Sequence, residues 1–336
     1  GEWELKAELR LIGEDKDHYR LVFDRTPFYP EGGGQVGDTG KIRAEVAPGQ
    51  WLEFTVVDTA REQDKIWHVV AKGEEPFPRH AITYELQVDV DRRKMAAANH
   101  TATHLLHAVL RRLVGTHLHQ AGSYVSNERL RFDFTHYQRL EPELLNQVEQ
   151  EVNRLIFAAL PVKVEELDYE EALNRGALAF FGEKYGDRVR TVAVGGVSME
   201  LCGGTHVKNS AEILSFRILS EGSVAAGVRR IEAVTGWEAL RLAEQDRKLV
   251  KELAELLHSE PQQLKEKVSE VLADQARLKK TLEEQERKAA FAEGEKILAA
   301  VKEAGGHRYL VAKMDGLSME LLRENVDRFK DKLGSC

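Results

Sequence analysis

The segment "ANHTATHLLH", residues 98–107, places His100 and His104 four residues apart. Few helix-breaking residues occur between Ala96 and Leu113, so the pattern predicts a helix on which the two imidazoles share one face. Two histidines at this spacing can begin a metal site, but they do not complete the four-ligand shell of zinc. The remaining ligands must come from another part of the chain.

A second segment, "MELCGGTHV" at residues 199–207, supplies Cys202 and His206. Three imidazoles and one thiolate suit tetrahedral zinc, so we expect a Zn²⁺ site built from these two segments. "HTATH" has no glutamate where H-E-x-x-H carries its general base, which excludes a zincin-type protease. His107 lies on the same helical face, and the sequence leaves open whether it packs in the core or contacts a substrate.

The composition indicates a globular chain of two or three domains, with 336 residues, 31% charged residues and a net charge of −8. That charge argues against non-specific coating of nucleic acid. Only two cysteines occur, Cys202 and Cys336; they could pair in principle, but such sparse use favours a reducing cytoplasm. No export leader and no run of roughly 18 apolar residues is evident, so no membrane partner is expected. Because the chain starts at Gly1, we expect a processed or excised piece.

Changes in residue pattern divide the chain into four regions and predict an α+β fold class. Residues 1–90 are rich in β-strand formers and predict a small β-barrel or sandwich. Residues 91–236 alternate helical and strand patterns, with a strand predicted at "RLRFDFTHY", and predict an α+β domain that contains the zinc site. Residues 237–304 predict a helical coiled-coil arm, and residues 305–336 the start of an incomplete α/β domain.

The arm carries an apolar seam with steps of three, four or seven residues, from Leu242 to Leu282. In "SEPQQL" we expect Ser259 to cap a new helix, Pro261 to lie in its first turn and Gln262 to complete a capping box. The strand predicted at "HRYLVAKM" and the helix predicted at "SMELLRENVDRFKDKL" cannot bury a core alone. We therefore expect a partner helix, and a homodimer through the arm and the terminal region.

With both halves of the metal set in view, the chain resembles the editing domain of alanine–tRNA ligases. The segments that carry the resemblance are "DRTPFYPEGGGQVGDTG", "NHTATHLLHAVLRRLVGTHLHQAGSYV", "RLRFDFTH", "MELCGGTHV" and "GVRRIEAVTG", in that order across residues 24–236. The arm and the final strand and helix resemble the start of the C-terminal oligomerisation region. The ATP-binding aminoacylation half of these enzymes is not expected in this chain.

The resemblance implies an aminoacyl-tRNA deacylase that removes serine or glycine from mischarged tRNA(Ala). It implies zinc ligation by His100, His104, Cys202 and His206, and it matches Thr26 to a residue that contacts the hydroxyl of serine. Gln120 corresponds to a glutamine of the editing pocket, with His119 as an alternative proton acceptor. The glycine segment, Gly32, Gly33 and Gly34, is expected to face the substrate together with Gln35.

Contacts with the tRNA acceptor end are expected from Arg229 and Arg230, which lie in one of the matching segments. Eight basic residues in 89–139 could add a local basic face; they are Arg92, Arg93, Lys94, Arg111, Arg112, Arg129, Arg131 and Arg139. Two other interpretations remain open from the sequence. One is a long free-standing editing protein of the AlaX type, and the other is a non-catalytic tRNA-binding and oligomerisation module with a structural zinc.

Overall fold

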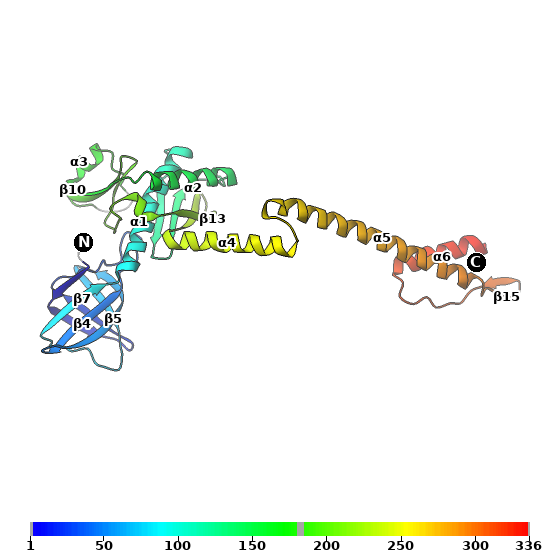
Figure 1. Cartoon of the computed structure of the whole chain (residues 1–336), viewed down its shortest axis with the longest axis horizontal. Coiled ribbons are helices and arrows are strands. Elements are labelled where there is room, and N and C mark those ends of the chain that lie inside the picture. The colour runs from blue at the N-terminus through cyan, green and yellow to red at the C-terminus, as the bar shows by residue number, and fades with distance from the viewer. Residues whose placement is uncertain (1–2, 180–184, 335–336) are drawn as a thin grey trace. The chain divides into compact units, whose positions relative to one another are not determined.

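The computed structural model describes residues 3–179 and 185–334 and divides the chain into two compact units, residues 1–244 and 245–336 (Figure 1). The first unit contains antiparallel sheets and helices that follow one another along the chain. The second contains helices and a two-stranded sheet. This mixture confirms the predicted α+β class.

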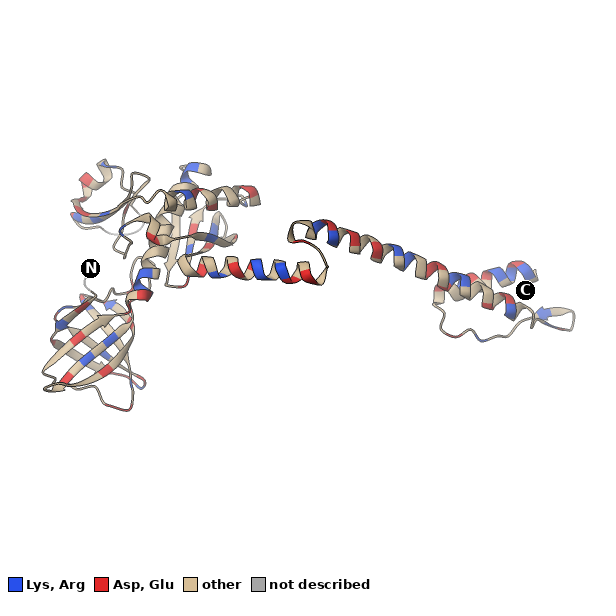
Figure 2. Ribbon diagram, viewed as in Figure 1, with Lys and Arg blue, Asp and Glu red and all other residues tan. Residues whose placement is uncertain are grey.

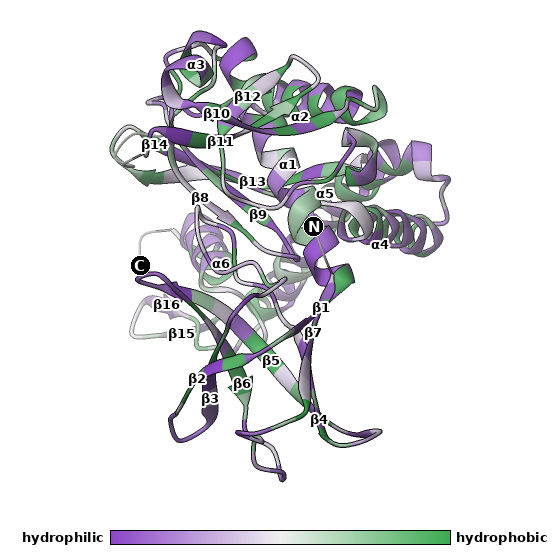
Figure 3. Cartoon of the chain, turned by 90° about the vertical axis from the view of Figure 1, so that its left-hand side faces the viewer, coloured by the Kyte–Doolittle hydropathy of each residue, from purple (hydrophilic) through white to green (hydrophobic). Residues whose placement is uncertain are grey.

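The N-terminal part of the first unit is a single antiparallel sheet that curls around an apolar core (Figure 3). Its strands are β1 (Glu4–Ala7), β2 (Leu9–Glu14), β3 (His18–Phe23), β4 (Gly40–Ala47), β5 (Gln50–Glu62), β6 (Lys65–Ala71) and β7 (Thr83–Val88). They lie in the order β1-β7-β4-β5-β6-β3-β2. Because β1 and β2 stand at opposite ends of this order but are joined only by Glu8, the sheet has to curl. Alternate residues such as Leu21, Ile42 and Leu86 point inward and are fully buried.

The rest of the first unit is built around α1 (Val90–Leu113), which follows directly after β7. Asp89 caps this helix by accepting a hydrogen bond from the amide of Arg92. The helix lies with a four-stranded antiparallel sheet that contains β8 (Gln120–Val125), β9 (Leu130–Thr135), β13 (Phe216–Ala225) and β14 (Val228–Thr235). Leu105 and Leu110 of α1 share one buried apolar cluster with Phe132 of the sheet. The helix predicted from residues 96–113 and the strand predicted at "RLRFDFTHY" are therefore confirmed.

Further elements complete the first unit. They are α2 (Pro142–Phe157), α3 (Tyr169–Asn174), the 3-10 turn η1 (Ser210–Ile213), and a small antiparallel sheet of β10 (Val162–Asp168), β11 (Arg188–Val194) and β12 (Ser198–Leu201). The buried residues Val148, Val152 and Ile156 of α2 belong to the same apolar cluster as α1. The loop after β12 carries Cys202 and His206.

A long helix, α4 (Gly236–Leu256), leaves the first unit and ends in the second. The second unit continues with η2 (Pro261–Gln263), α5 (Leu264–Leu298), the hairpin of β15 (Lys302–Ala304) and β16 (His307–Tyr309), and α6 (Met319–Leu333). Acidic and basic residues are interspersed along α4 and α5 (Figure 2). Gly294 allows α6 to approach α5 closely, because a Cβ there would lie 2.4 Å from Oδ1 of Asn325.

Two expectations about the second unit need correction. Ser259 does not cap a helix: its hydroxyl donates to the carbonyl of Glu260 at 3.2 Å, and Glu260 precedes η2 without any side-chain cap. The predicted capping box with Gln262 is therefore wrong, although Pro261 does begin the turn. The strand expected across "HRYLVAKM" is shorter than predicted, because only His307–Tyr309 pairs with a second strand.

The apolar seam of the arm is exposed in the described chain. Seven of its residues range from 42% exposed at Leu253 to 75% at Leu256, and the others of the seven are Leu249, Val268, Val271, Leu278 and Leu282. Leu242 and Leu264 are partly buried. None of the described helices is both long and apolar enough to cross a bilayer. The Cys202–Cys336 pair considered from the sequence includes a residue outside the described ranges.

Candidate metal centre

The two segments identified from their histidine and cysteine spacing meet in the structure. His100 and His104 on α1, and Cys202 and His206 on the loop after β12, each offer one ligand atom, and these atoms all lie within 4.8 Å of one another. The Sγ atom of Cys202 lies 3.4 Å from Nε2 of His100 and 3.3 Å from Nε2 of His206. The predicted juxtaposition is confirmed, and the group could hold a metal ion.

A hydrogen bond with Gln35 fixes the tautomer of His100. The amide of Thr205 donates to Oε1 of Gln35 at 2.9 Å, which identifies that atom as the oxygen of the side-chain amide. The same oxygen lies 2.7 Å from Nδ1 of His100. Because a carbonyl oxygen can only accept, Nδ1 must carry the proton. The Nε2 lone pair of His100 then faces Cys202.

A hydrogen bond with Thr101 likewise fixes the tautomer of His206. The Thr101 hydroxyl donates to the carbonyl of Ala97 at 2.9 Å, so it can only accept from Nδ1 of His206, which lies 3.1 Å away. The Nε2 lone pair of His206 is therefore also directed toward Cys202. Two of the three imidazoles thus have one nitrogen bonded to the protein and the other available for a metal, as is usual for histidine ligands.

The third imidazole, His104, lies beside a buried carboxylate. Its Nε2 is 3.6 Å from Oε2 of Glu200, and its buried Nδ1 has no hydrogen-bond partner among the described residues. Glu200 also accepts from Nδ1 of His107 at 3.0 Å and from Ser198 at 3.2 Å. His107 thus contacts the carboxylate and packs on Phe132, with ring centres 5.2 Å apart. This contact answers the question that the sequence left open for His107 in favour of packing.

Burial keeps these imidazoles neutral. Desolvation, with the neighbouring His104 as a smaller cause, lowers the pKa of His100 to about 3. Desolvation also lowers the pKa of His104 and places the pKa of His206 well below its ordinary value. Since a metal binds only the neutral imidazole, all three rings carry available lone pairs at neutral pH.

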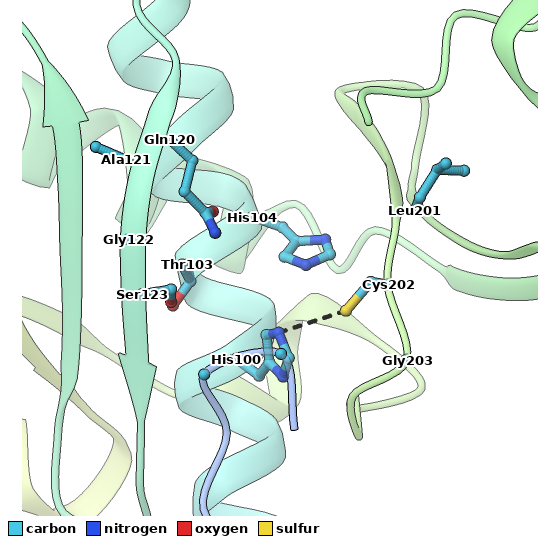
Figure 4. A pocket seen from close by; sticks show the side chains of 12 residues that line it. His100, Thr103, His104, Gln120, Ala121, Gly122, Ser123, Leu201, Cys202 and Gly203 are labelled. Carbon is cyan, nitrogen blue, oxygen red and sulfur yellow. Dashed lines mark hydrogen bonds between the residues drawn. The ribbon is translucent and has the colours of Figure 1, made fainter. Parts of the chain in front are cut away.

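A cavity of about 340 Å³ opens beside the histidines and Cys202 (Figure 4). It is lined by Gly33, Gly34, His100, Thr103, His104, Gln120, Ala121, Gly122, Ser123, Leu201, Cys202 and Gly203. Gln120 of β8 points toward the centre of this space from the side opposite Cys202. The Ser123 hydroxyl is buried and has no hydrogen-bond partner among the described residues. The cavity therefore combines a potential metal group with polar side chains, as a small-molecule site does.

The cavity contains some of the residues singled out from the sequence and not others. Gln120, Gly33 and Gly34 line it, whereas Gly32 does not. Gln35 is fully buried and bonded to His100 and Thr205, so the structure does not favour the expectation that its amide faces a substrate.

Thr26 also lies outside the cavity lining. Its hydroxyl is 2.7 Å from Nε2 of the fully buried His68 and accepts from the amide of Phe28 at 3.1 Å. Desolvation lowers the pKa of His68 to about 4, so the ring is neutral at neutral pH. A contact between Thr26 and a substrate therefore remains a prediction from the resemblance alone.

Several of the basic residues singled out from the sequence have partners within the chain, Arg229, Arg230 and Arg93 among them. Arg229 pairs through two nitrogens with Glu221, and Arg230 pairs in the same way with Asp133 at 2.7 Å. Arg93 is 8% exposed and pairs with Asp38. Such pairing gives these side chains a structural role, and contact with tRNA by Arg229 and Arg230 remains a prediction.

Sequence reasoning missed Thr103 and Ser123. Thr103 lies three residues after His100 and one before His104, a spacing that places it on the same helical face as His100. Its hydroxyl donates to the carbonyl of Asn99 at 2.9 Å, which leaves its lone pairs available to accept. The spacing of Thr103 from the two histidines could therefore have identified it from the sequence. For Ser123, only the pairing of β8 with β9 and the packing of the glycine segment show that it faces the cavity.

Two family descriptions match parts of this chain. "Threonyl and Alanyl tRNA synthetase second additional domain" matches residues 189–232, and "tRNA synthetases class II (A)" matches residues 6–92. Among curated proteins, the alanine–tRNA ligase of Fusobacterium nucleatum is 44% identical over 97% of this chain and 37% of its own length. That of Oleidesulfovibrio alaskensis is 42% identical over 98% of this chain and 38% of its own length. The chain therefore spans little more than a third of these relatives.

Proposed function

This chain belongs to the alanine–tRNA ligase family, matching a segment of its members, and on that basis we propose that it hydrolyses mischarged tRNA(Ala). The bond broken is the ester between the amino acid and the terminal ribose, and the products are a free amino acid and tRNA. Serine and glycine are the proposed amino acids. The observation that carries the proposal is the cavity in which Gln120, Ser123 and Thr103 adjoin the His–Cys group.

Chemistry explains why alanine needs such a correction. A binding pocket shaped for alanine cannot exclude glycine by size, and it discriminates weakly against an added hydroxyl. A second site that hydrolyses the wrong ester can supply the missing selectivity. A buried polar group in that site discriminates strongly, because an alanyl ester leaves it without a partner at a cost of about 1–3 kcal/mol.

Zinc is the metal that the donor set fits. A tetrahedral site with Zn–N of about 2.0–2.1 Å and Zn–S of about 2.3 Å places neighbouring ligand atoms roughly 3.3–3.6 Å apart. The separations of 3.4 and 3.3 Å between Cys202 and the two Nε2 atoms fall in this range, and the whole group of ligand atoms lies within 4.8 Å. His100, His104, Cys202 and His206 would hold the ion, which would supply positive charge beside the cavity and join α1 to the loop after β12 when bound.

The side chains of the cavity have separate roles in the proposed hydrolysis. Four protein ligands close a tetrahedral site, so we assign the orientation of the attacking water to Gln120, whose amide can both donate and accept. Thr103 accepts the hydroxyl of a seryl ester, since its own proton is directed to Asn99. Ser123 is available to the amino group or the ester oxygen because its hydroxyl has no described protein partner.

Release of serine from seryl-tRNA(Ala) tests this function. The wild-type chain loaded with zinc is expected to hydrolyse seryl-tRNA(Ala) at least about tenfold faster than alanyl-tRNA(Ala), the difference that one unsatisfied buried hydrogen bond produces. Hydrolysis of glycyl-tRNA(Ala) is expected as well, but this hydrogen bond does not set its rate. Release of labelled amino acid over time measures the three rates. A chain that binds tRNA but leaves seryl-tRNA at its spontaneous rate of hydrolysis would be a non-catalytic module with a structural metal.

The chain could be a piece of a longer ligase or a free-standing editing protein of the AlaX type, and the proposed chemistry is the same in both cases. The similarity to alanine–tRNA ligases over nearly the whole chain favours the first of these. Whether the gene continues upstream into an ATP-binding half distinguishes them directly. For the tRNA itself, we propose that the acceptor end is the part bound, since the ester lies there.

We also propose a homodimer through the second unit. The exposed apolar seam on α4 and α5 has the spacing of a helix-pairing surface, and its flanks are charged. Deleting residues 245–336 is expected to abolish the dimer while zinc binding and some deacylation remain. Sedimentation of both forms measures this, and the same dimer in the shortened form would place the interface in the first unit.

A further inference from the structure

The glycine segment that leaves the N-terminal sheet docks directly on β8. The amide of Val125 donates to the carbonyl of Gly34 at 2.7 Å, and the amide of Val36 donates back to Val125 at 3.0 Å. Gly34 has a φ of +80°, and a Cβ there would lie 2.4 Å from the carbonyl oxygen of Ser123. Only glycine tolerates both conditions. The segment therefore pairs with the free edge of β8, and the register of this pairing determines the direction in which the side chain of Gln35 points.

That next residue, Gln35, is carried into the protein beside the metal ligands. Its side chain is fully buried. Its amide nitrogen donates to the hydroxyl of Thr205 at 2.8 Å, and its oxygen accepts from the Thr205 amide at 2.9 Å and from Nδ1 of His100 at 2.7 Å. One side chain thus connects the helix that carries His100 with the loop that carries Cys202 and His206.

The three segments meet with no spare room. A Cβ at Gly204 would lie 2.1 Å from the ring of His100 and 3.0 Å from Oε1 of Gln35. Arg190 supports the same loop from another direction by donating to the carbonyls of Cys202 at 2.6 Å and Gly204 at 2.8 Å. The position of the loop is therefore determined by contacts on both sides. Thr101 of α1 bonds to His206 of the loop, and Gln35 adds a second link by bonding to His100 and to Thr205.

From this geometry we propose that Gln35 is a positioning residue of the metal centre. It holds His100 as the Nδ1–H tautomer and ties it to the Cys202–His206 loop, so that ligands 102 residues apart in sequence form one site. The proposal rests on the metal centre described under the proposed function. It makes the N-terminal sheet part of that centre, because a residue that joins its two halves comes from the segment between β3 and β4.

This role differs from the substrate contact expected for Gln35 from the sequence. A residue that binds substrate has to present a polar atom to the cavity, whereas the lining of the cavity does not include Gln35. Loss of a residue that orients a histidine ligand typically weakens metal binding by about 10- to 100-fold. Loss of a substrate contact changes the apparent affinity for substrate and leaves metal binding intact.

Metal affinity of the full chain tests the proposal, with zinc measured by competition against a chelator and Co²⁺ as a spectroscopic probe. Gln35→Leu fills a similar volume without hydrogen bonds, and it is expected to weaken metal binding by about 10- to 100-fold and to change the visible spectrum of the Co²⁺ form. Gln35→Glu keeps an oxygen that accepts from His100 and from the Thr205 amide, so it is expected to bind within a few-fold of wild type. Glu31→Gln, an exposed change in the same segment, is the matched control and is expected to match wild type.

Each other outcome has a definite meaning. If wild type binds no metal, the metal centre itself is refuted, and not merely the role of Gln35. If Gln35→Leu binds zinc and Co²⁺ as wild type does, the positioning role is overturned. Equal weakening in Gln35→Leu and Gln35→Glu would also overturn it, because the effect would then come from packing and not from the hydrogen bond to His100.

Discussion

Replacing Cys202 with alanine is expected to produce the largest loss, removing stoichiometric zinc and abolishing deacylation of seryl-tRNA(Ala). Cys202 is the only thiolate of the four ligands, and its Sγ lies within 3.4 Å of two imidazole nitrogens. A structural zinc site contributes about 10–16 kcal/mol of binding free energy, so one of four ligands accounts for about 2.5–4 kcal/mol, or roughly 100- to 1000-fold in affinity.

Elemental analysis after dialysis measures the zinc, and circular dichroism checks that the helices of the second unit remain. Cys336→Ala is the matched control, since it deletes the other cysteine of the chain and is expected to leave zinc and activity unchanged. Unchanged zinc content in Cys202→Ala would remove this residue from the centre.

The second large effect is expected from Thr103→Val, which keeps the shape of the side chain and deletes its hydroxyl. Because we propose that this hydroxyl accepts from the seryl ester, hydrolysis of seryl-tRNA(Ala) should slow by about 5- to 150-fold, the equivalent of about 1–3 kcal/mol. The glycyl group has no side-chain hydroxyl that could donate to Thr103, so hydrolysis of glycyl-tRNA(Ala) should change much less. Zinc content should stay at the wild-type level, since Thr103 is not a ligand.

Thr26→Val is the comparison that makes this result informative. The resemblance implies that Thr26 contacts the hydroxyl of serine. In the structure, however, the Thr26 hydroxyl is hydrogen-bonded to His68, and Thr26 does not line the cavity. We expect a smaller and less selective effect from this change. If Thr26→Val slows seryl-tRNA selectively and Thr103→Val slows both substrates equally, the assignment to Thr103 is wrong and the one from the resemblance is right.

The parts of the site that could be predicted are those in which spacing within one segment determines geometry. Histidines four residues apart share a helical face whatever the helix packs against, and a cysteine and a histidine on a short glycine-rich loop can turn toward a common point. The periodicity that predicted the long helix and the strand at residues 130–135 is equally local.

What could not be predicted depends on contacts between distant segments. Gln35 bonds to Thr205, 170 residues away, and only the docking of the glycine segment on β8 shows that the amide faces inward. In the sequence, nothing distinguishes Glu200 from other strand residues. Its position beside His104 and His107 follows only from the packing of β12 against α1. The error at Ser259 has a simpler cause, because its hydroxyl donates to the adjacent carbonyl of Glu260 instead of accepting from the next turn.

The most direct test of the whole account is the rate of seryl-tRNA(Ala) hydrolysis measured as a function of zinc bound to the wild-type chain. The metal would be removed with a chelator and restored in steps, with zinc content and the rate of serine release determined on the same samples. We predict that activity falls to the spontaneous rate when zinc is removed, rises in proportion to occupancy and levels off at one ion per chain, with alanyl-tRNA(Ala) spared throughout. Full activity in the metal-free chain, or no activity at full occupancy, would contradict the account.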